Sequence, residues 1–312
     1  MQVFDSIKDV TKNKNTVLTL GTFDGIHPGH LKIIDKLVDC SKEKGCRNVV
    51  ITFHPHPRTV LSSGNNVKML TTQEERRNLL EKHGVENFLT INFTKEFASL
   101  TAEEFIYDYL VNGIGISEIV LGHDHHFGKG RAGNVELLKK IGAREKFSVT
   151  TVDAYYIKGV VVSSTKIRNA INEGDLSRAN SLLGRNYSFS GSVVGGDKRG
   201  RELGYPTANI KLSSPEKLLP AIGIYAVRVL LENENYFGLL SIGKRPTFYN
   251  MGETVTEVYI FNFDREIYGK EVTVEMIERL RGEEKFNSAE DLINQMNRDK
   301  ENGLKIFNKL NN

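Results

Sequence analysis

The sequence predicts two domains of different class: an α/β domain built on a parallel sheet, and then an antiparallel β-barrel or sandwich that ends in a helix. The chain has 312 residues, which is long for a single domain. Strand-like runs alternate with helical periodicity in the first half, whereas the second half is strand-like until its last segment. The pattern changes after Gly184, so we place the boundary between residues 184 and 185.

The first half alternates buried-strand patterns with amphipathic helices, which indicates βαβ units and a parallel sheet covered on both faces. We expect strands at residues 16–20, 48–53, 88–92 and 118–121, and helices at 30–44, 71–83, 102–111, 135–141, 164–172 and 175–183. Polar segments at 21–30, 54–57 and 123–126 each follow one of these strands. Because open parallel sheets bind ligands at the carboxyl ends of their strands, we expect the three segments to meet at one edge.

The second half contains strand-like runs rich in β-branched and aromatic residues, separated by turn signals. We expect strands at residues 187–194, 224–230, 236–242, 254–261 and 271–279, followed by a helix at 288–309. All eight histidines lie in the first 126 residues. Any chemistry of the second half therefore proceeds without imidazole.

The overall composition is that of a globular protein with balanced charge. With 42 basic and 39 acidic residues, the net charge of +3 argues against nucleic acid or an anionic membrane as a partner. The N-terminus lacks the apolar core of a signal peptide, and no apolar run is long enough to span a bilayer, so we expect a cytoplasmic protein. Cys40 and Cys46 could form a disulfide, but free thiols are favoured. Monomer and weak oligomer both stay open.

Residues 21–30, GTFDGIHPGH, join the first strand to the first helix. Gly21 and Gly25 allow the backbone to approach a phosphate, and the helix N-terminus offers N–H groups and a positive dipole end. His27 and His30 are three residues apart, so both can face one ligand and stabilise charge on an α-phosphate under attack. The alternative is a glycine-rich turn with incidental histidines. No P-loop occurs in the chain, and this segment lacks the G-x-G-x-x-G fingerprint, so it predicts nucleotidyl transfer from ATP by another type of site.

Residues 191–210, GSVVGGDKRGRELGYPTANI, form a glycine-rich segment that carries Lys198 and two arginines, which alone is a weak phosphate signal. Thr207 and Asn209 are two residues apart, so they share a face of an extended segment. Their side-chain oxygens suit Mg²⁺ together with substrate phosphates. The alternative is a proline-started turn in which the asparagine bonds locally.

A kinase that acts on an alcohol benefits from a base that takes the hydroxyl proton. Because this half lacks histidine, a carboxylate is the natural candidate. Glu257 lies in an otherwise apolar, aromatic strand, TEVYIFNF. Its side chain either serves as this base or points to solvent from the polar face of the strand, and the residues alone leave both open.

Several segments together resemble a known family. The first-half segment looks like the H-x-G-H signature of nucleotidylyltransferases, and TFHPHP (52–57), LGHDHHFGKGRAG (121–133) and SSTKIRNAI (163–171) follow in the order of the FMN adenylyltransferase module of bacterial bifunctional riboflavin kinase/FAD synthetases. In the second half, PTAN, GIYAVRV (223–229), SIGKRPTF (241–248), the Glu257 strand and RGEEKF (281–286) resemble the riboflavin kinase module. The resemblance covers nearly the whole chain.

The resemblance implies a Rossmann-like nucleotidylyltransferase domain at residues 1–184 and a riboflavin kinase β-barrel at residues 185–312. It implies that His27 and His30 stabilise the transferring phosphate. The residues implied for ATP in this domain are Gly21, Phe23, Asp24, Gly25, Ser164, Thr165 and Arg168, and those implied for flavin are His56, Asp124 and Phe127. From the residues alone, Ser164 and Thr165 are equally good helix caps, and His56 fits a stiff turn after a strand.

In the second domain, the resemblance implies that Thr207 and Asn209 bind Mg²⁺ and ATP and that Glu257 activates the ribityl 5′-hydroxyl. Gly191 and Lys198 would contribute to the ATP site, and Arg281 would lie near the flavin. The chain departs from the family pattern twice, with His125 where a phenylalanine is expected and Tyr259 where histidine is more usual. The histidines at 123–126 lack further ligands at metal-binding spacing, so a metal site there is disfavoured.

Three readings compete. The favoured one is an enzyme that phosphorylates riboflavin with ATP to FMN, and then adenylylates FMN with ATP to FAD and pyrophosphate, using Mg²⁺. An H-x-G-H transferase with another phosphate acceptor predicts no kinase module, and PTAN with Glu257 argues against it. A non-catalytic flavin-binding protein predicts loss of the histidine pair or of Glu257, and all are present. In a milder variant, one of the two activities has faded.

Overall fold

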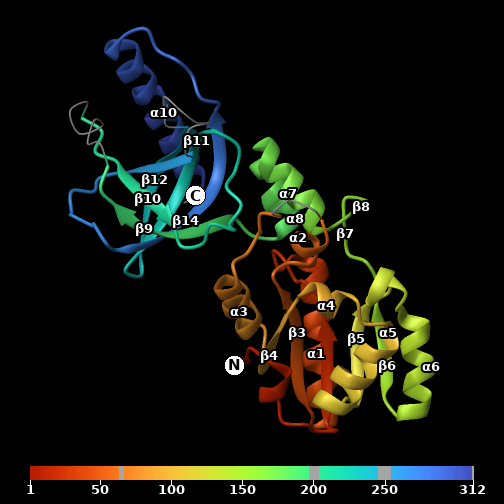
Figure 1. Cartoon of the computed structure of the whole chain (residues 1–312). Coiled ribbons are helices and arrows are strands. Elements are labelled where there is room, and N and C mark those ends of the chain that lie inside the picture. Colours follow the sequence, from red (N-terminus) through yellow and green to blue (C-terminus); the bar gives the residue numbers. More distant parts are fainter. Residues whose placement is uncertain (63–66, 197–203, 245–253, 311–312) are drawn as a thin grey trace. The chain divides into compact units, whose positions relative to one another are not determined.

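A computed structural model describes residues 1–62, 67–196, 204–244 and 254–310 of the chain. Packing divides the chain into two compact units, Met1–Ser164 and Thr165–Asn312. Figure 1 labels many of the elements of both units.

The first unit is built on one parallel sheet of six strands in the order β1-β4-β3-β2-β5-β6. The strands are β1 (Gln2–Phe4), β2 (Thr16–Leu20), β3 (Arg47–His54), β4 (Asn87–Asn92), β5 (Glu118–Gly122) and β6 (Ser148–Val152). The four central strands confirm the predicted ones. The sequence missed β1 and β6, because edge strands are half exposed and their apolar pattern is correspondingly weak.

Helices connect the strands and cover both faces of the sheet. They are η1 (Ile7–Asp9), α1 (Pro28–Lys44), α2 (Pro57–Leu61), α3 (Gln73–Lys82), α4 (Lys95–Ala98), α5 (Ala102–Glu104), η2 (Phe105–Ile114), η3 (Lys129–Arg131) and α6 (Val135–Glu145). A short hairpin of β7 (Tyr156–Ile157) and β8 (Val160–Val161) follows β6. The predicted capping box is confirmed at the start of α3, where Thr72 and Glu75 each bond the other's backbone N–H.

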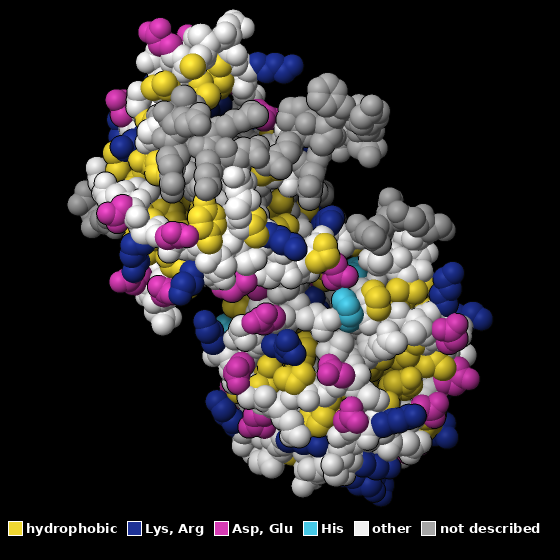
Figure 2. Space-filling view, turned by 60° about the vertical axis from the view of Figure 1, so that its left-hand side comes forward, with side chains coloured by type: hydrophobic (Ala, Val, Ile, Leu, Met, Phe, Trp, Pro, Cys, Tyr) yellow, Lys and Arg dark blue, Asp and Glu magenta, His cyan; other side chains and the backbone are white. Residues whose placement is uncertain are grey.

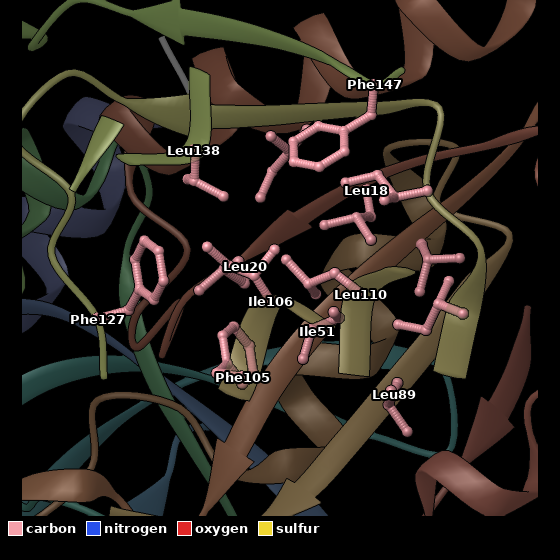
Figure 3. Close-up of a cluster of buried hydrophobic side chains, with 14 of the residues drawn as sticks. Leu18, Leu20, Ile51, Leu89, Phe105, Ile106, Leu110, Phe127, Leu138 and Phe147 are labelled. Atoms are coloured by element: carbon pink, nitrogen blue, oxygen red, sulfur yellow. The ribbon is translucent and has the colours of Figure 1, made fainter. Parts of the chain in front are cut away.

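Alternate residues of the buried strands feed two cores. Val17 of β2 packs with Ile34 and Leu37 of α1 on one face, whereas Leu18 packs with Leu110 of η2 on the other. Figure 3 shows this second core, in which side chains of η2 and α6 meet those of the sheet. The period of two along each strand therefore explains why the strands are apolar throughout.

The helix predicted at residues 102–111 is a composite. One α-helical turn, α5, leads directly into a π-helix, η2, that ends at Gly115. Gly115 has φ of +83°, and its N–H donates to the Leu110 carbonyl oxygen. Hydrophobic periodicity registers an apolar face but does not separate the wide π turns from α turns, so the sequence placed the end of this helix too early.

The second unit combines two helices with a closed β-barrel in the order β10-β13-β12-β11-β14-β9. Its elements are α7 (Ser164–Glu173, whose first residue belongs to the first unit), α8 (Leu176–Leu183), β9 (Tyr187–Val194), β10 (Ala208–Leu212), β11 (Gly223–Leu231), β12 (Glu234–Lys244), β13 (Thr254–Ile260), β14 (Glu271–Arg281) and α10 (Ala289–Leu310). The five predicted strands are confirmed. The sixth, β10, was missed because it is short and follows a polar, glycine-rich segment, yet its pairing with β9 and β13 closes the barrel.

Packing groups α7 and α8 with the barrel. The Asn180 side chain of α8 donates to the Met276 carbonyl oxygen and accepts the Tyr187 N–H, and the Ala221 N–H donates to the Ile171 carbonyl oxygen of α7. The boundary predicted from sequence groups these helices with the sheet instead, and it stays a prediction.

Helix α10 covers part of the outside of the barrel. Phe307 is only 2% exposed, and its ring stacks on Phe237 of β12 with centroids 4.2 Å apart. Ala226, Leu239 and Phe261 are buried in the same hydrophobic cluster as Phe307. Within the described ranges, no helix is both long and apolar enough to cross a membrane.

We predict that Phe307→Ala destabilises the barrel unit by about 3 kcal/mol, because it empties a buried aromatic position and removes a stacked ring. Calorimetric unfolding should show the loss in the transition of this unit. Leu304→Ala is the matched control, because Leu304 lies on the same helix but is 39% exposed. Equal effects of the two variants would contradict the assigned packing.

Candidate active sites

Three polar segments lie at the carboxyl edge of the sheet in the first unit. They follow β3, β2 and β5, which are direct neighbours and run parallel, so the predicted convergence at one edge is confirmed. This edge is where open parallel sheets bind their ligands.

The turn between β2 and α1 has an unusual backbone. Phe23, Gly25 and Ile26 have φ values of +46°, +88° and +40°. Positive φ is costly for a bulky and for a β-branched residue, of order 1–3 kcal/mol each. Both side chains are almost completely buried, and this packing offsets the cost. The backbone conformation of the turn is therefore set by tertiary packing and not by the local preferences of its residues.

Asp24 anchors this turn. It is 1% exposed, and its carboxylate accepts the backbone N–H groups of Leu70 (3.1 Å) and Thr71 (3.0 Å) and the Thr71 hydroxyl. The Gly25 N–H donates to the same hydroxyl oxygen at 3.0 Å. The carboxylate therefore ties the turn to the segment before α3. Its predicted contact with ATP stays a prediction.

His27 and His30 lie together at the start of α1. His27 is the N-cap, and its Nδ1 accepts the His30 N–H at 3.3 Å. That bond places the proton of the neutral ring on Nε2, which leaves Nε2 as a donor. The two rings stack with centroids 3.6 Å apart. A Cβ at Gly29 would come within 3.2 Å of the His27 ring, so glycine at this position leaves space for the imidazole.

The segment that follows the β7–β8 hairpin also reaches the turn. The Ser164 hydroxyl donates to the Asp24 carbonyl oxygen at 2.8 Å, so it braces the turn in addition to standing at the start of α7. Thr165 and Arg168 lie in the first turns of α7, within the second unit. Binding of ATP by these three residues stays a prediction.

The predicted flavin residues occupy the two flanking loops. His56 caps α2, and its Nδ1 accepts the Arg58 N–H at 3.1 Å. Asp124 is exposed directly after β5. Phe127 is 8% exposed, and its ring lies 5.8 Å from Phe105, at the end of an aromatic cluster. Their contact with flavin stays a prediction, and the cap on α2 means that the turn interpretation of His56 also holds.

His125 stands where the family pattern has phenylalanine, and its ring stacks near Phe127 with centroids 6.2 Å apart. Its Nε2 atom is buried and lacks a hydrogen-bond partner among the described residues. Burial lowers the pKa of His125 to about 4, an effect that the Asp124 carboxylate opposes and the charges of His126 and Arg131 reinforce. The side chain is therefore neutral at neutral pH.

In the second unit, the barrel brings Thr207, Asn209 and Glu257 together. Asn209 of β10 pairs directly with Glu257 of β13, so the two side chains share a face of the sheet. The Thr207 hydroxyl donates to the Glu257 carboxylate at 3.4 Å. Glu257 is half-buried and alternates with Thr256 and Val258, which face the barrel interior. A hydroxyl, an amide oxygen and a carboxylate thus converge on one patch.

Two glycines explain how the neighbouring strand fits. A Cβ at Gly191 would collide with the Lys211 carbonyl oxygen, and one at Gly196 would collide with the Asn209 amide. Gly191 therefore permits the close approach of β10, and Gly196 forms a cradle for the asparagine. A direct role of Gly191 toward ATP stays a prediction. Lys198 lies outside the described residues.

Arg281 at the end of β14 binds a carboxylate of the protein itself. Its guanidinium contacts both oxygens of Asp299 on α10 at 2.8–3.0 Å, and Asp299 is 4% exposed. Its Nη1 donates to the Gly282 carbonyl oxygen. The observed contacts thus fasten α10 to the barrel, and the predicted flavin contact stays a prediction.

Sequence reasoning missed several residues that shape the two sites. The Thr71 hydroxyl donates to the Asp24 carboxylate, 47 residues away in the sequence. Buried Arg76 donates to Thr52 near the end of β3. Tyr205 donates to Asn297 of α10. The sequence shows a threonine, Thr71, just before the capping box and a tyrosine, Tyr205, before PTAN. It gives no sign of their hydrogen-bond partners, because these lie far away along the chain.

Comparison with known proteins identifies the class. A family model for FAD synthetase matches residues 9–166, and one for riboflavin kinase matches residues 183–307. The bifunctional riboflavin kinase/FMN adenylyltransferase of Listeria monocytogenes is 40% identical over 95% of this chain and 94% of its own length. The Bacillus subtilis protein of the same name is 37% identical over 95% and 93%, and that of Escherichia coli K12 is 35% identical over 93% and 92%.

A solved structure agrees in fold over the whole length. The crystal structure of a macrolide-efflux protein from Streptococcus pneumoniae has a TM-score of 0.87 and 34% identity, and the match covers 96% of this chain and 97% of that one. Its name concerns that protein, whereas both domains of this chain match enzyme families.

The chain therefore belongs to the family of bifunctional riboflavin kinase/FMN adenylyltransferases. It is a transferase with an FAD synthetase domain and a riboflavin kinase domain, and its substrates are ATP and flavins. The predicted family, fold class and pair of activities are confirmed. Cys40 and Cys46 are free thiols, as the sequence favoured.

We predict that His125→Phe stabilises the first unit, and more so in acid. The unfolded histidine takes up its proton below pH 6.5, whereas the folded one does so only near pH 4, so the wild type loses up to about 3 kcal/mol as pH falls between these values. The phenylalanine variant lacks this loss, and it also lacks an unpaired buried nitrogen worth about 1 kcal/mol.

Melting temperature measured against pH checks this prediction. The curves of wild type and variant should separate progressively from pH 6.5 downward. His126→Phe is the control, because His126 is exposed, and its curve should parallel that of the wild type. A constant offset between His125→Phe and wild type at every pH would show that the imidazole does not titrate as assigned.

Proposed function

We propose that the two activities run at two separate sites: adenylyl transfer at the turn before α1, and phosphoryl transfer at the patch of Thr207, Asn209 and Glu257. The observation that carries the second assignment is the pairing of Asn209 with Glu257, with the Thr207 hydroxyl donating to the same carboxylate. The first rests on the stacked histidines at a helix N-terminus beside a constrained turn.

At the first site, a phosphate oxygen of FMN attacks the α-phosphorus of ATP, and the bond to pyrophosphate breaks as the new P–O bond of FAD forms. Negative charge gathers on the α-phosphate oxygens. His27 can donate from Nε2, and the N-terminus of α1 adds its positive dipole end. His30 stacks on His27 and holds its ring in place. Asp24 and Ser164 keep the turn in shape, so the reacting groups meet already oriented.

At the second site, the residues fit Mg²⁺ with ATP. Thr207 and Asn209 offer the hard oxygen ligands that this ion prefers, and the glycine at 196 makes room for the asparagine amide itself. Bound Mg²⁺ would neutralise charge on the phosphates. Glu257 accepts the proton of the ribityl 5′-hydroxyl as its oxygen attacks the γ-phosphorus, which leaves ADP. Its place across from Asn209 puts base and nucleotide ligands on one face.

The proposal extends to the setting of the enzyme. We place it in the cytoplasm, with riboflavin, FMN and ATP as its substrates and without a nucleic-acid partner. The net charge of +3 argues against a nucleic-acid partner, as does the interspersion of acidic and basic side chains on the visible face in Figure 2. Sedimentation at several concentrations distinguishes the monomer from the weak oligomer.

Incubation with riboflavin, ATP and Mg²⁺, followed by chromatographic separation of the flavins, tests the proposed reactions. FMN should appear first and FAD second, and omission of Mg²⁺ should stop FMN formation. Unchanged riboflavin in the complete mixture would overturn the proposal.

We predict that Glu257→Gln lowers FMN formation at least about 100-fold, because the amide does not take the hydroxyl proton. Conversion of added FMN to FAD should stay within about twofold of wild type, because that reaction uses the other site. Loss of both activities, or of neither, would contradict the assignment of the base.

The reciprocal variant is His30→Ala. We predict at least about a tenfold loss of FAD formation, because His27 loses the ring that orients it toward the transferring phosphate. FMN formation should be unaffected, and rates measured with each flavin substrate separately show the split. An unchanged FAD rate would remove the histidine pair from the proposed mechanism.

A further inference from the structure

Thr207 is placed just beyond the reach of the barrel's own hydrogen bonds. The pairing of β10 with β13 covers Ala208 with Val258 and Asn209 with Glu257, and Thr207 precedes the first pair. Its contact with Glu257 measures 3.4 Å, which is long for a hydrogen bond between oxygens. A residue that is to bind Mg²⁺ and nucleotide therefore needs a further constraint on its backbone.

Tyr205 supplies a contact two residues earlier. Its side chain is 8% exposed, and its hydroxyl donates to the Asn297 side-chain oxygen on α10. Burial raises the pKa of Tyr205, with smaller contributions from Tyr259 and Asp299, so the hydroxyl stays protonated and able to donate. The segment that leads into β10 is thereby tied to the C-terminal helix.

Tyr259 holds the ring of Tyr205 from the side of the catalytic strand. It lies two residues after Glu257 on β13, and therefore on the same face. Its ring meets that of Tyr205 edge to face, with centroids 5.1 Å apart, and it also contacts Phe261. Tyr205 is thus fixed against the strand of Glu257 by its ring and against α10 by its hydroxyl.

Helix α10 is itself a firm support at this point. Asp299, two residues after Asn297, is held by the Arg281 guanidinium and accepts the Gln295 side-chain amide at 2.9 Å. The Arg281–Asp299 ion pair is nearly buried, with side-chain exposures of 15% for Arg281 and 5% for Asp299. Both carboxylate oxygens of Asp299 are hydrogen-bonded, which makes the geometry of the pair specific. Asn297 is itself exposed, but it stands on a stretch of α10 that this ion pair holds to the barrel.

We propose that Tyr205 and Asn297 are positioning residues of the riboflavin kinase site: they hold Thr207 beside Glu257 and so set the affinity for the Mg²⁺–nucleotide complex. This inference rests on the proposed function of Thr207, Asn209 and Glu257. Tyr259 takes part through its ring, which gives a role to a residue that departs from the family pattern.

The test uses the full-length enzyme with Tyr205→Phe, Asn297→Ala and the double variant. FMN formation is measured at saturating riboflavin with varied ATP and constant excess Mg²⁺. We expect the KM for ATP to rise about 3- to 10-fold, the effect of one neutral hydrogen bond, with kcat within about twofold. The double variant should be no worse than the worse single one, because both remove the same bond.

Tyr236→Phe is the matched control. Its hydroxyl also donates to a side-chain oxygen, that of Glu234, but on an exposed hairpin at the start of β12. It should leave the KM for ATP unchanged. FAD formation from FMN, which uses the first site, should be unchanged in every variant.

Hydrogen exchange gives a readout that does not depend on turnover. Without nucleotide, residues 205–212 should exchange faster in Tyr205→Phe than in wild type, while β11 and β14 keep their protection. Added Mg²⁺–ADP should slow exchange of this segment in the wild type at lower concentrations than in the variant. A merely stabilising role of Tyr205 would instead speed exchange throughout the barrel.

Thr207→Ala distinguishes a failure of the positioning role of Tyr205 from a failure of the proposed kinase site. A raised KM for ATP in Thr207→Ala together with an unchanged KM in Tyr205→Phe would overturn the positioning role alone. An unchanged KM and kcat in Thr207→Ala would overturn the proposed kinase site as well. An equal rise in Tyr236→Phe would show a general effect of tyrosine hydroxyls and would also overturn the inference.

Discussion

The buried carboxylate of Asp24 is the interaction on which the shape of the turn between β2 and α1 depends. The turn needs positive φ at two bulky residues, which an isolated peptide would avoid. Two backbone N–H groups and a hydroxyl of the segment before α3 bond this carboxylate, and Ser164 bonds the carbonyl of the same residue. With the turn held, α1 begins at a defined point and its first-turn histidines stack.

The riboflavin kinase domain solves a similar problem by different means. Its candidate base lies on a regular strand, and antiparallel register alone brings Asn209 opposite Glu257. Thr207 lies beyond this register, and the tyrosine contacts with β13 and α10 extend the constraint to it. Both sites therefore depend on one or two polar contacts between residues far apart in the chain, set into a scaffold of apolar packing.

Much of the fold was predictable because hydrophobic period and turn chemistry are local properties. The central parallel strands, the capping box at Thr72 and five barrel strands follow from such patterns. The convergence of the three polar segments also followed, since parallel strands end at one edge. Other elements could not be predicted because their local patterns are weak or ambiguous. These are the edge strands β1 and β6, the short strand β10 and the π-helical turns of η2. Local patterns left barrel and sandwich open; the family resemblance implied the barrel, and the pairing of β9 with β10 and β14 shows it closed.

By itself, the sequence determined the family, the two reactions and the order of the domains, because the motifs of both modules occur in it in order. Only the tertiary structure decided what Asp24 and Arg281 contact: backbone amides in one case, and Asp299 of the C-terminal helix in the other. It also decided that His125 is a neutral ring whose Nε2 is buried and has no hydrogen-bond partner in the described part of the chain. Such facts depend on which groups folding brings within about 3 Å of each other. The sequence position of a charged or polar side chain does not show which group will be its partner.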